Sequence, residues 1–208
     1  MFSRFAGGGA RYRGGWPCAW RPIALLLLML LMLPLLAVAN GTDYRIDPNR
    51  SEAMFRVRLF WLDKVNGEFT HIDGDVVPGP QPGSWVVNAT IPVDSVTLPS
   101  THMRQLLLAP SFFDVRHHPT IHFVSNPIAQ AALDHGGALT GHLTLRGVTA
   151  PIRFAMEPVQ CKRLAMTPCQ IVLRGMLQRS TFGMTSDRLA LSDSVDLNLN
   201  ITLQPETR

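Results

Sequence analysis

Alternation of apolar and polar residues is the feature that most restricts the fold of this chain. In VDLNLNITL (195–203) every second residue is apolar, and Asp, Asn and Thr stand between them. A period of two places the two kinds of side chain on opposite faces, as in a strand with one buried face. The pattern recurs, more weakly in the last two segments, in residues 54–60, 85–93, 120–123, 138–146, 151–157 and 171–177.

Turn-forming residues separate these runs. They occur in PGPQPG (78–83), DHGG (134–137) and RGVTAP (146–151), and the glycine of the last segment predicts a tight hairpin. HIDGD (71–75) has paired aspartates without the other ligands of a calcium loop, so we interpret it as a strand running into a turn. About eight antiparallel strands in one domain are expected.

The predicted fold class is therefore mostly β. An eight-stranded antiparallel barrel protects all strand edges by closing on itself, and a two-sheet sandwich is the alternative. One segment departs from the alternation. STHMRQLLLAP offers Ser100 or Thr101 as an N-cap and Pro110 as a stop, which predicts one short helix around 102–108.

The first 39 residues are typical of a secretory signal peptide. Four arginines precede the apolar run IALLLLMLLMLPLL, and Ala37-Val38-Ala39 matches the small-x-small cleavage pattern. An uncleaved membrane anchor is the alternative, but Pro34 interrupts the run. We expect cleavage after Ala39, which leaves an exported domain over residues 40–208.

Charge and cysteine content restrict the functional classes further. The arginines of the leader account for the whole formal charge of +4, so the mature chain is neutral and nucleic-acid binding has no compositional support. Cys161 and Cys169 are the two cysteines that remain, and in an oxidising compartment we expect a disulfide between them. Two reduced thiols are the alternative.

Three histidines lie close together in SFFDVRHHPTIHF (111–123). Pro119 disfavours a helix that would bring His118 and His122 to one face, and alternation in TIHF turns His122 away from Phe123. We therefore expect exposed histidines and no metal site, with a histidine-based metal protein as an alternative hypothesis. No nucleophile elbow, HExxH or phosphate loop occurs in the sequence, so no enzyme and no cofactor are predicted.

Phenylalanine is the dominant aromatic residue of the mature chain. Eight Phe compare with three Trp and Tyr together. An interior lined by Phe, Leu and Met suits a ligand without hydrogen-bonding groups, whereas a solidly filled apolar core has the same sequence pattern. Alternation alone favours the filled core.

Several motifs resemble the YceI-like family of polyisoprenoid-binding, lipocalin-like bacterial proteins. They occur in order along nearly the whole mature chain: YRIDPNRS (44–51), VNGEF (65–69), SFFDV (111–115) with Pro119 and Phe123, GHLTLRGVTAP (141–151) and RSTFGM (179–184). Three features depart from the family pattern. They are Arg50 in place of histidine, the leucine-rich MRQLLLAP before FFD, and the insertion VQCKRLAMTPCQ (159–170).

The resemblance implies an eight-stranded barrel with a helix at its mouth, an apolar cavity that holds an isoprenoid chain, and in many members a homodimer. We therefore expect a periplasmic carrier or sequestering protein for a hydrophobic lipid ligand, such as a quinone-like or polyprenyl isoprenoid. The predicted lining residues are Phe55, Val57, Phe69, Phe112, Phe113, Phe123, Leu143, Leu145, Phe182 and Met184. The alternative is an interaction module that docks a membrane redox partner through its leucine-rich helix.

Overall fold

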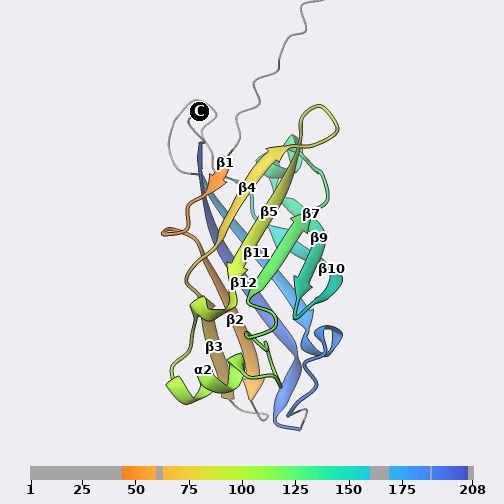
Figure 1. The fold of residues 1–208 in the computed structure, drawn as a ribbon. Coiled ribbons are helices and arrows are strands. Elements are labelled where there is room, and N and C mark those ends of the chain that lie inside the picture. Colours follow the sequence, from red (N-terminus) through yellow and green to blue (C-terminus); the bar gives the residue numbers. More distant parts are fainter. Residues whose placement is uncertain (1–43, 60–62, 160–168, 188, 206–208) are drawn as a thin grey trace, which may run out of the picture. The chain divides into compact units, whose positions relative to one another are not determined.

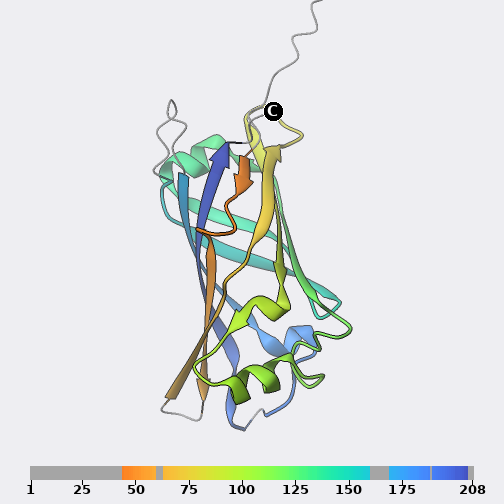
Figure 2. The same ribbon diagram turned by 60° about the vertical axis from the view of Figure 1, so that its left-hand side comes forward.

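The computed structural model describes residues 44–59, 63–159, 169–187 and 189–205. The chain divides into two units, 1–40 and 41–208, and all described residues belong to the second. Figures 1 and 2 show this unit. Its elements are β1 (Tyr44–Ile46), β2 (Glu52–Leu59), β3 (Asp63–Phe69), β4 (Asp73–Pro78), β5 (Ser84–Pro92), η2 (Val93–Ser95), β6 (Val96–Thr97), α2 (Thr101–Leu108), β7 (Thr120–Ser125), β8 (Ile128–Ala129), α3 (Gln130–His135), β9 (Gly137–Leu145), β10 (Val148–Met156), β11 (Cys169–Gln178), η3 (Arg179–Phe182) and β12 (Leu191–Pro205).

The strands form one closed antiparallel barrel. One edge of β12 pairs with β11, and the other pairs with β2 over residues 191–200 and with β1 over 203–205. In the same way β3 pairs with β2 and β6, while β4 pairs with β1 and β5. The pairs β1/β2, β3/β4 and β5/β6 therefore each act as one interrupted strand. These three strands, together with β7, β9, β10, β11 and β12, make the eight strands expected.

The strand register follows the sequence alternation. Along β12 the apolar residues Leu197, Leu199 and Ile201 face the interior, while Asp196 is exposed. The β9–β10 hairpin turns through Arg146 and Gly147, whose φ angles are 54° and 73°. Two consecutive positive φ angles are typical of the two-residue turn that matches strand twist, which confirms the predicted tight hairpin.

Helix α2 confirms the predicted helix and lies at one end of the barrel (Figure 1). Ser100 occupies the N-cap position, although its side chain makes no capping hydrogen bond. Two arginines hold the segment around the helix. Arg104 donates hydrogen bonds to the carbonyls of Val96 and Asp94, and Arg146 donates to the carbonyl of Pro110.

Two local expectations were wrong. A second helix, α3, covers the opposite end of the barrel (Figure 2), so the described residues contain two α-helices instead of one. HIDGD is also not a strand running into a turn. It leads into β4, which begins at Asp73, and the His71 imidazole contacts the Asp73 carboxylate at 2.8 Å.

No helix within the described ranges combines the length and the apolar character needed to span a bilayer.

Candidate functional site: an apolar cavity along the barrel

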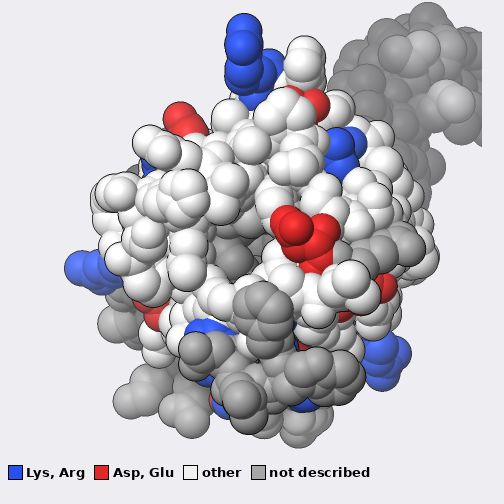
Figure 3. Space-filling view, turned by 90° about the horizontal axis from the view of Figure 1, so that it is seen from below, with Lys and Arg blue, Asp and Glu red and all other residues white. Residues whose placement is uncertain are grey.

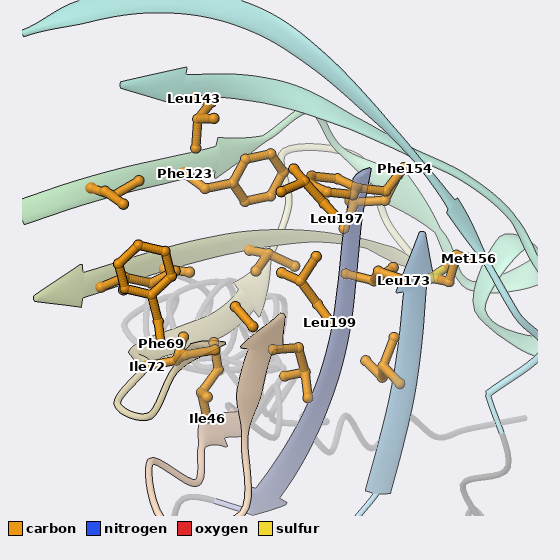
Figure 4. Close-up of a pocket in the computed structure, with 18 of the residues that line it drawn as sticks. Ile46, Phe69, Ile72, Phe123, Leu143, Phe154, Met156, Leu173, Leu197 and Leu199 are labelled. Carbon is orange, nitrogen blue, oxygen red and sulfur yellow. The ribbon is translucent and has the colours of Figure 1, made fainter. Parts of the chain in front are cut away.

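A cavity of about 760 Å³ occupies the barrel interior. It extends from Leu107 and Phe113 beside α2 to Ile128 and Leu133 at the α3 end. Figure 4 shows side chains from several strands converging on this space, nearly all of them hydrocarbon. Figure 3 shows the α2 end of the molecule from below. This face is hollowed near its centre, with uncharged described residues on one side of the hollow and acidic side chains directly beside it on another.

The cavity contains nine of the ten predicted lining residues. These are Phe55, Val57, Phe69, Phe112, Phe113, Phe123, Leu143, Leu145 and Met184. Phe182 is the exception: it belongs to η3 and to the buried apolar cluster, but it does not line the cavity. The interior is not the filled core that alternation alone favours.

Many further lining residues had a sequence signal that the prediction did not use. Each is an inward position of a strand with correctly predicted alternation, so continuing the period of two would have found them. They include Phe154, Met156, Ile171, Leu173, Leu177, Val195, Leu197, Leu199, Ile201 and Leu203. Selecting by residue type, mainly phenylalanine, missed this aliphatic part of the wall.

Two groups of aromatic rings stand out in the lining. Phe69 lies between Phe55 and Phe113, with ring centroids 5.6 and 5.8 Å away. Phe123 and Phe154 meet edge to face at 5.8 Å and 84°. Both distances and the tilted geometries are those that aromatic pairs prefer, so the rings are held in place by each other as well as by the wall.

Polar groups at the α3 end form a short hydrogen-bonded chain. The indole N–H of Trp85 donates to Oε1 of Gln130 at 2.9 Å, and Nε2 of Gln130 donates to Oδ1 of Asp134 at 3.2 Å. All three residues line the cavity, and Tyr44 packs edge to face against Trp85. This end can therefore offer hydrogen bonds to a polar head group, whereas the strand walls offer dispersion contacts alone.

Arg179 brings a charge to the other end of the cavity. Its side chain is 4% exposed and donates hydrogen bonds to the carbonyls of Ser192, Met184, Ser186 and Leu191. Buried charges are costly unless such partners surround them. The guanidinium thus ties η3 and the following loop to the start of β12.

The histidines of 111–123 do not converge. His117 contacts the Asp114 carboxylate at 2.9 Å, while His122 bonds to the hydroxyls of Thr90 and Thr120 on the outside of the barrel. His118 is half-buried next to Gly147. Across the part of the chain that the structure describes, no three His, Cys, Asp or Glu residues are grouped to hold a metal, so the metal-protein alternative has no site there.

The predicted disulfide falls partly outside the described residues. Cys169 begins β11, is buried in the wall and lines the cavity. Cys161 lies outside the described residues, so the bond between the two stays a prediction.

Comparison with known proteins decides the family. The YceI-like domain family matches residues 44–203, from the first strand of the barrel nearly to the end of its last. This chain belongs to the YceI-like family. The family match contains every motif on which the resemblance was based, including the two segments with departures at Arg50 and before FFD.

Individual relatives of this YceI-like domain are distant. A UPF0312 protein of Pectobacterium carotovorum is 29% identical over 134 residues, which cover 62% of this chain and 69% of the relative. Protein YceI of Escherichia coli O6:H1 is 26% identical over 175 residues, covering 78% and 87%.

Solved structures of similar fold include Burkholderia cenocepacia BcnA, with a TM-score of 0.62, 20% identity and coverage of 76% of this chain and 98% of that one. A polyisoprenoid binding domain from Saccharophagus degradans also has a TM-score of 0.62, with 14% identity and coverage of 80% and 100%. At these identities the likeness concerns the fold.

Proposed function

We propose that this YceI-like domain holds an isoprenoid, such as a quinone-like or polyprenyl lipid, or a similar amphiphile in its barrel cavity, and that it acts as a carrier or sequestering protein. The observation that carries the proposal is the cavity itself. Its volume of about 760 Å³ falls within the roughly 300–1,000 Å³ typical of small-molecule sites, and its walls are predominantly apolar.

The energetics of such a site are favourable without any chemical step. Each methylene transferred from water into an apolar environment contributes about 0.8 kcal/mol, and ordering the chain offsets part of this. The polyisoprenoid binding domain that shares the fold supports the same class of ligand. The side chains around the cavity provide contact and shape, which is the chemistry of a binding protein.

The test is to extract the purified native protein with organic solvent and to identify the released lipid by mass spectrometry. In an Ala89→Trp variant the indole would fill space in the cavity, since Ala89 lines it from β5, and the lipid content should fall most of the way to zero. Val124→Trp is the matched control, because Val124 is 49% exposed on the neighbouring strand. A lipid-free wild-type extract would refute the proposal.

We also propose that the protein is periplasmic, on the basis of the leader described above. Fractionation of the producing bacterium should recover it with periplasmic markers, and N-terminal sequencing should begin at Asn40. Recovery of the full-length chain from the inner membrane would favour the uncleaved anchor instead.

A second candidate function is docking of a membrane redox partner through α2. Two apolar side chains support it, because Met103 and Leu106 are 38% and 48% exposed on this helix. Leu106→Asp should then prevent co-purification with a membrane cytochrome while leaving the lipid content unchanged. Unaltered capture of the cytochrome by this variant would exclude α2 as the docking surface.

A further inference from the structure

One row of inward-facing positions crosses the barrel wall from β9 to β3. The strand registers pair neighbours in turn: Leu139 with Phe154, Phe154 with Gly175, Gly175 with Leu197, Leu197 with Phe55, and Phe55 with Gly67. We call these six residues the Phe–Gly row. Each of its two phenylalanines has a glycine as the directly opposite residue, and small and large residues alternate in this way where barrels must fit their contents.

At both glycines the neighbouring ring occupies the space of the missing side chain. A Cβ at position 67 would overlap Cζ of Phe55 and lie 2.6 and 2.8 Å from its two Cε atoms. A Cβ at position 175 would lie 2.5 and 2.9 Å from Cδ1 and Cε1 of Phe154. Both rings therefore lean onto the backbone of the adjacent strand, close against the wall.

At Gly141 and Gly74 the nearest obstacle is backbone, although a Cβ at Gly141 would also lie 2.8 Å from Cε2 of Phe123. A Cβ at Gly141 would overlap the carbonyl oxygen of Val124, and one at Gly74 would overlap that of Asn88. Those glycines are required because two backbones approach closely. Gly67 meets side-chain atoms of Phe55, and a ring can move where a backbone cannot.

The open space beside both rings is the cavity, which Phe55 and Phe154 line. The wall backbone lies behind Phe55 and Phe154, and the rings of Phe69 and Phe123 flank them at 5.6 and 5.8 Å. Since carbon atoms pack at roughly 3.5–4.0 Å, an added methyl would move either ring inward by roughly 1 Å. The cavity would become narrower at the Phe–Gly row, part of which is visible around Phe154 and Leu197 in Figure 4.

We infer that Gly67 and Gly175 determine which chains the cavity accepts, by keeping it wide enough for a methyl-branched chain. This inference rests on the proposed function and specifies its ligand class. A methyl-branched isoprenoid fills the wide bore, whereas a straight alkyl chain leaves gaps in which wall atoms lose their contact partners. The two glycines are thus specificity-determining residues, and Phe55 and Phe154 are the groups they position.

The test compares two alcohols that differ only in their methyl branches, phytanol and hexadecan-1-ol. Delipidated wild-type protein should bind phytanol more tightly than hexadecan-1-ol. Gly67→Ala and Gly175→Ala should each weaken phytanol binding roughly tenfold, which is the effect of a single methyl-sized misfit in a hydrophobic pocket, and should change hexadecan-1-ol binding far less. Thermal unfolding of each variant shows that the barrel is intact.

A second substitution checks the mechanism. Phe55→Leu in the Gly67→Ala background and Phe154→Leu in the Gly175→Ala background should restore phytanol binding, because the smaller side chain leaves room for the added methyl. If Gly175→Ala does not fold, the position 67 pair decides the question. The inference would be overturned if the glycine variants lost affinity for both alcohols equally, or if the leucine substitutions did not restore phytanol binding. Either result would leave the proposed function standing. A wild-type protein that binds neither alcohol would overturn the proposed function itself.

Discussion

Arg179 shows what a single residue contributes to this barrel. The sequence places it in the RSTFGM motif, but nothing in the local pattern predicts that its guanidinium is buried among four carbonyl groups. Arginine is among the residues that are rarely buried, so residue type argues for the surface. Only the tertiary fold, which brings the start of β12 beside η3, creates the site.

Replacing Arg179 by Met should therefore destabilise the protein strongly. The four carbonyls would lose a charged donor and stay buried, and we expect the free energy of unfolding to fall by about 3 kcal/mol or more. Chemical denaturation measures this. Arg174→Met is the control, since the Arg174–Glu157 ion pair is largely exposed and should contribute less than about 1 kcal/mol. Equal effects of the two substitutions would contradict the structural role of Arg179.

Strands and helices could be predicted where neighbouring residues in the sequence carry the pattern. The runs predicted at 54–60, 85–93 and 195–203 correspond to β2, β5 and β12, and Pro119 immediately precedes β7. The break between β3 and β4 was not predicted. It arises because β3 pairs with β2 whereas β4 pairs with β1, and such pairing cannot be seen in a local pattern. Helix α3 was missed because it has six residues and no side-chain cap.

Helix α2 has two apolar faces with different roles. Leu107 lines the cavity, whereas the adjacent Leu106 is 48% exposed. Leu107→Asp would bring a carboxylate to an apolar site, so we expect it to reduce the lipid content measured by solvent extraction. Leu106→Asp is the matched control and should leave the content unchanged. If both variants retained full lipid content, α2 would have no part in the site.

For the whole molecule, alternation could not distinguish a filled barrel from a hollow one. Both bury the same face of every strand, so the sequence patterns are identical, and the resemblance to the YceI-like family was needed to predict a cavity. Nine of the ten predicted lining residues do lie in the cavity wall. The homodimer that the resemblance implies stays a prediction.

The predicted disulfide belongs to the same scale, because it connects the segment after β10 to the start of β11. We expect purified mature protein to resist alkylation at Cys161 and Cys169 until it is reduced, and to lose about 2–3 kcal/mol of stability on reduction. Mass spectrometry after alkylation, with and without reductant, measures the first effect. Two adducts on unreduced protein would show that the thiols are free.

Closure of the barrel joins opposite ends of the described chain. Tyr44–Ile46 pairs with 203–205, and the backbone N–H of Thr202 donates to the hydroxyl of Ser51 at 3.0 Å. Contacts over about 150 residues make folding slow. More importantly, β1 and β2 have no partner on that edge until β12 has been synthesised. A chain that lacks β12 therefore cannot close the barrel, and the cavity forms only once this strand is in place.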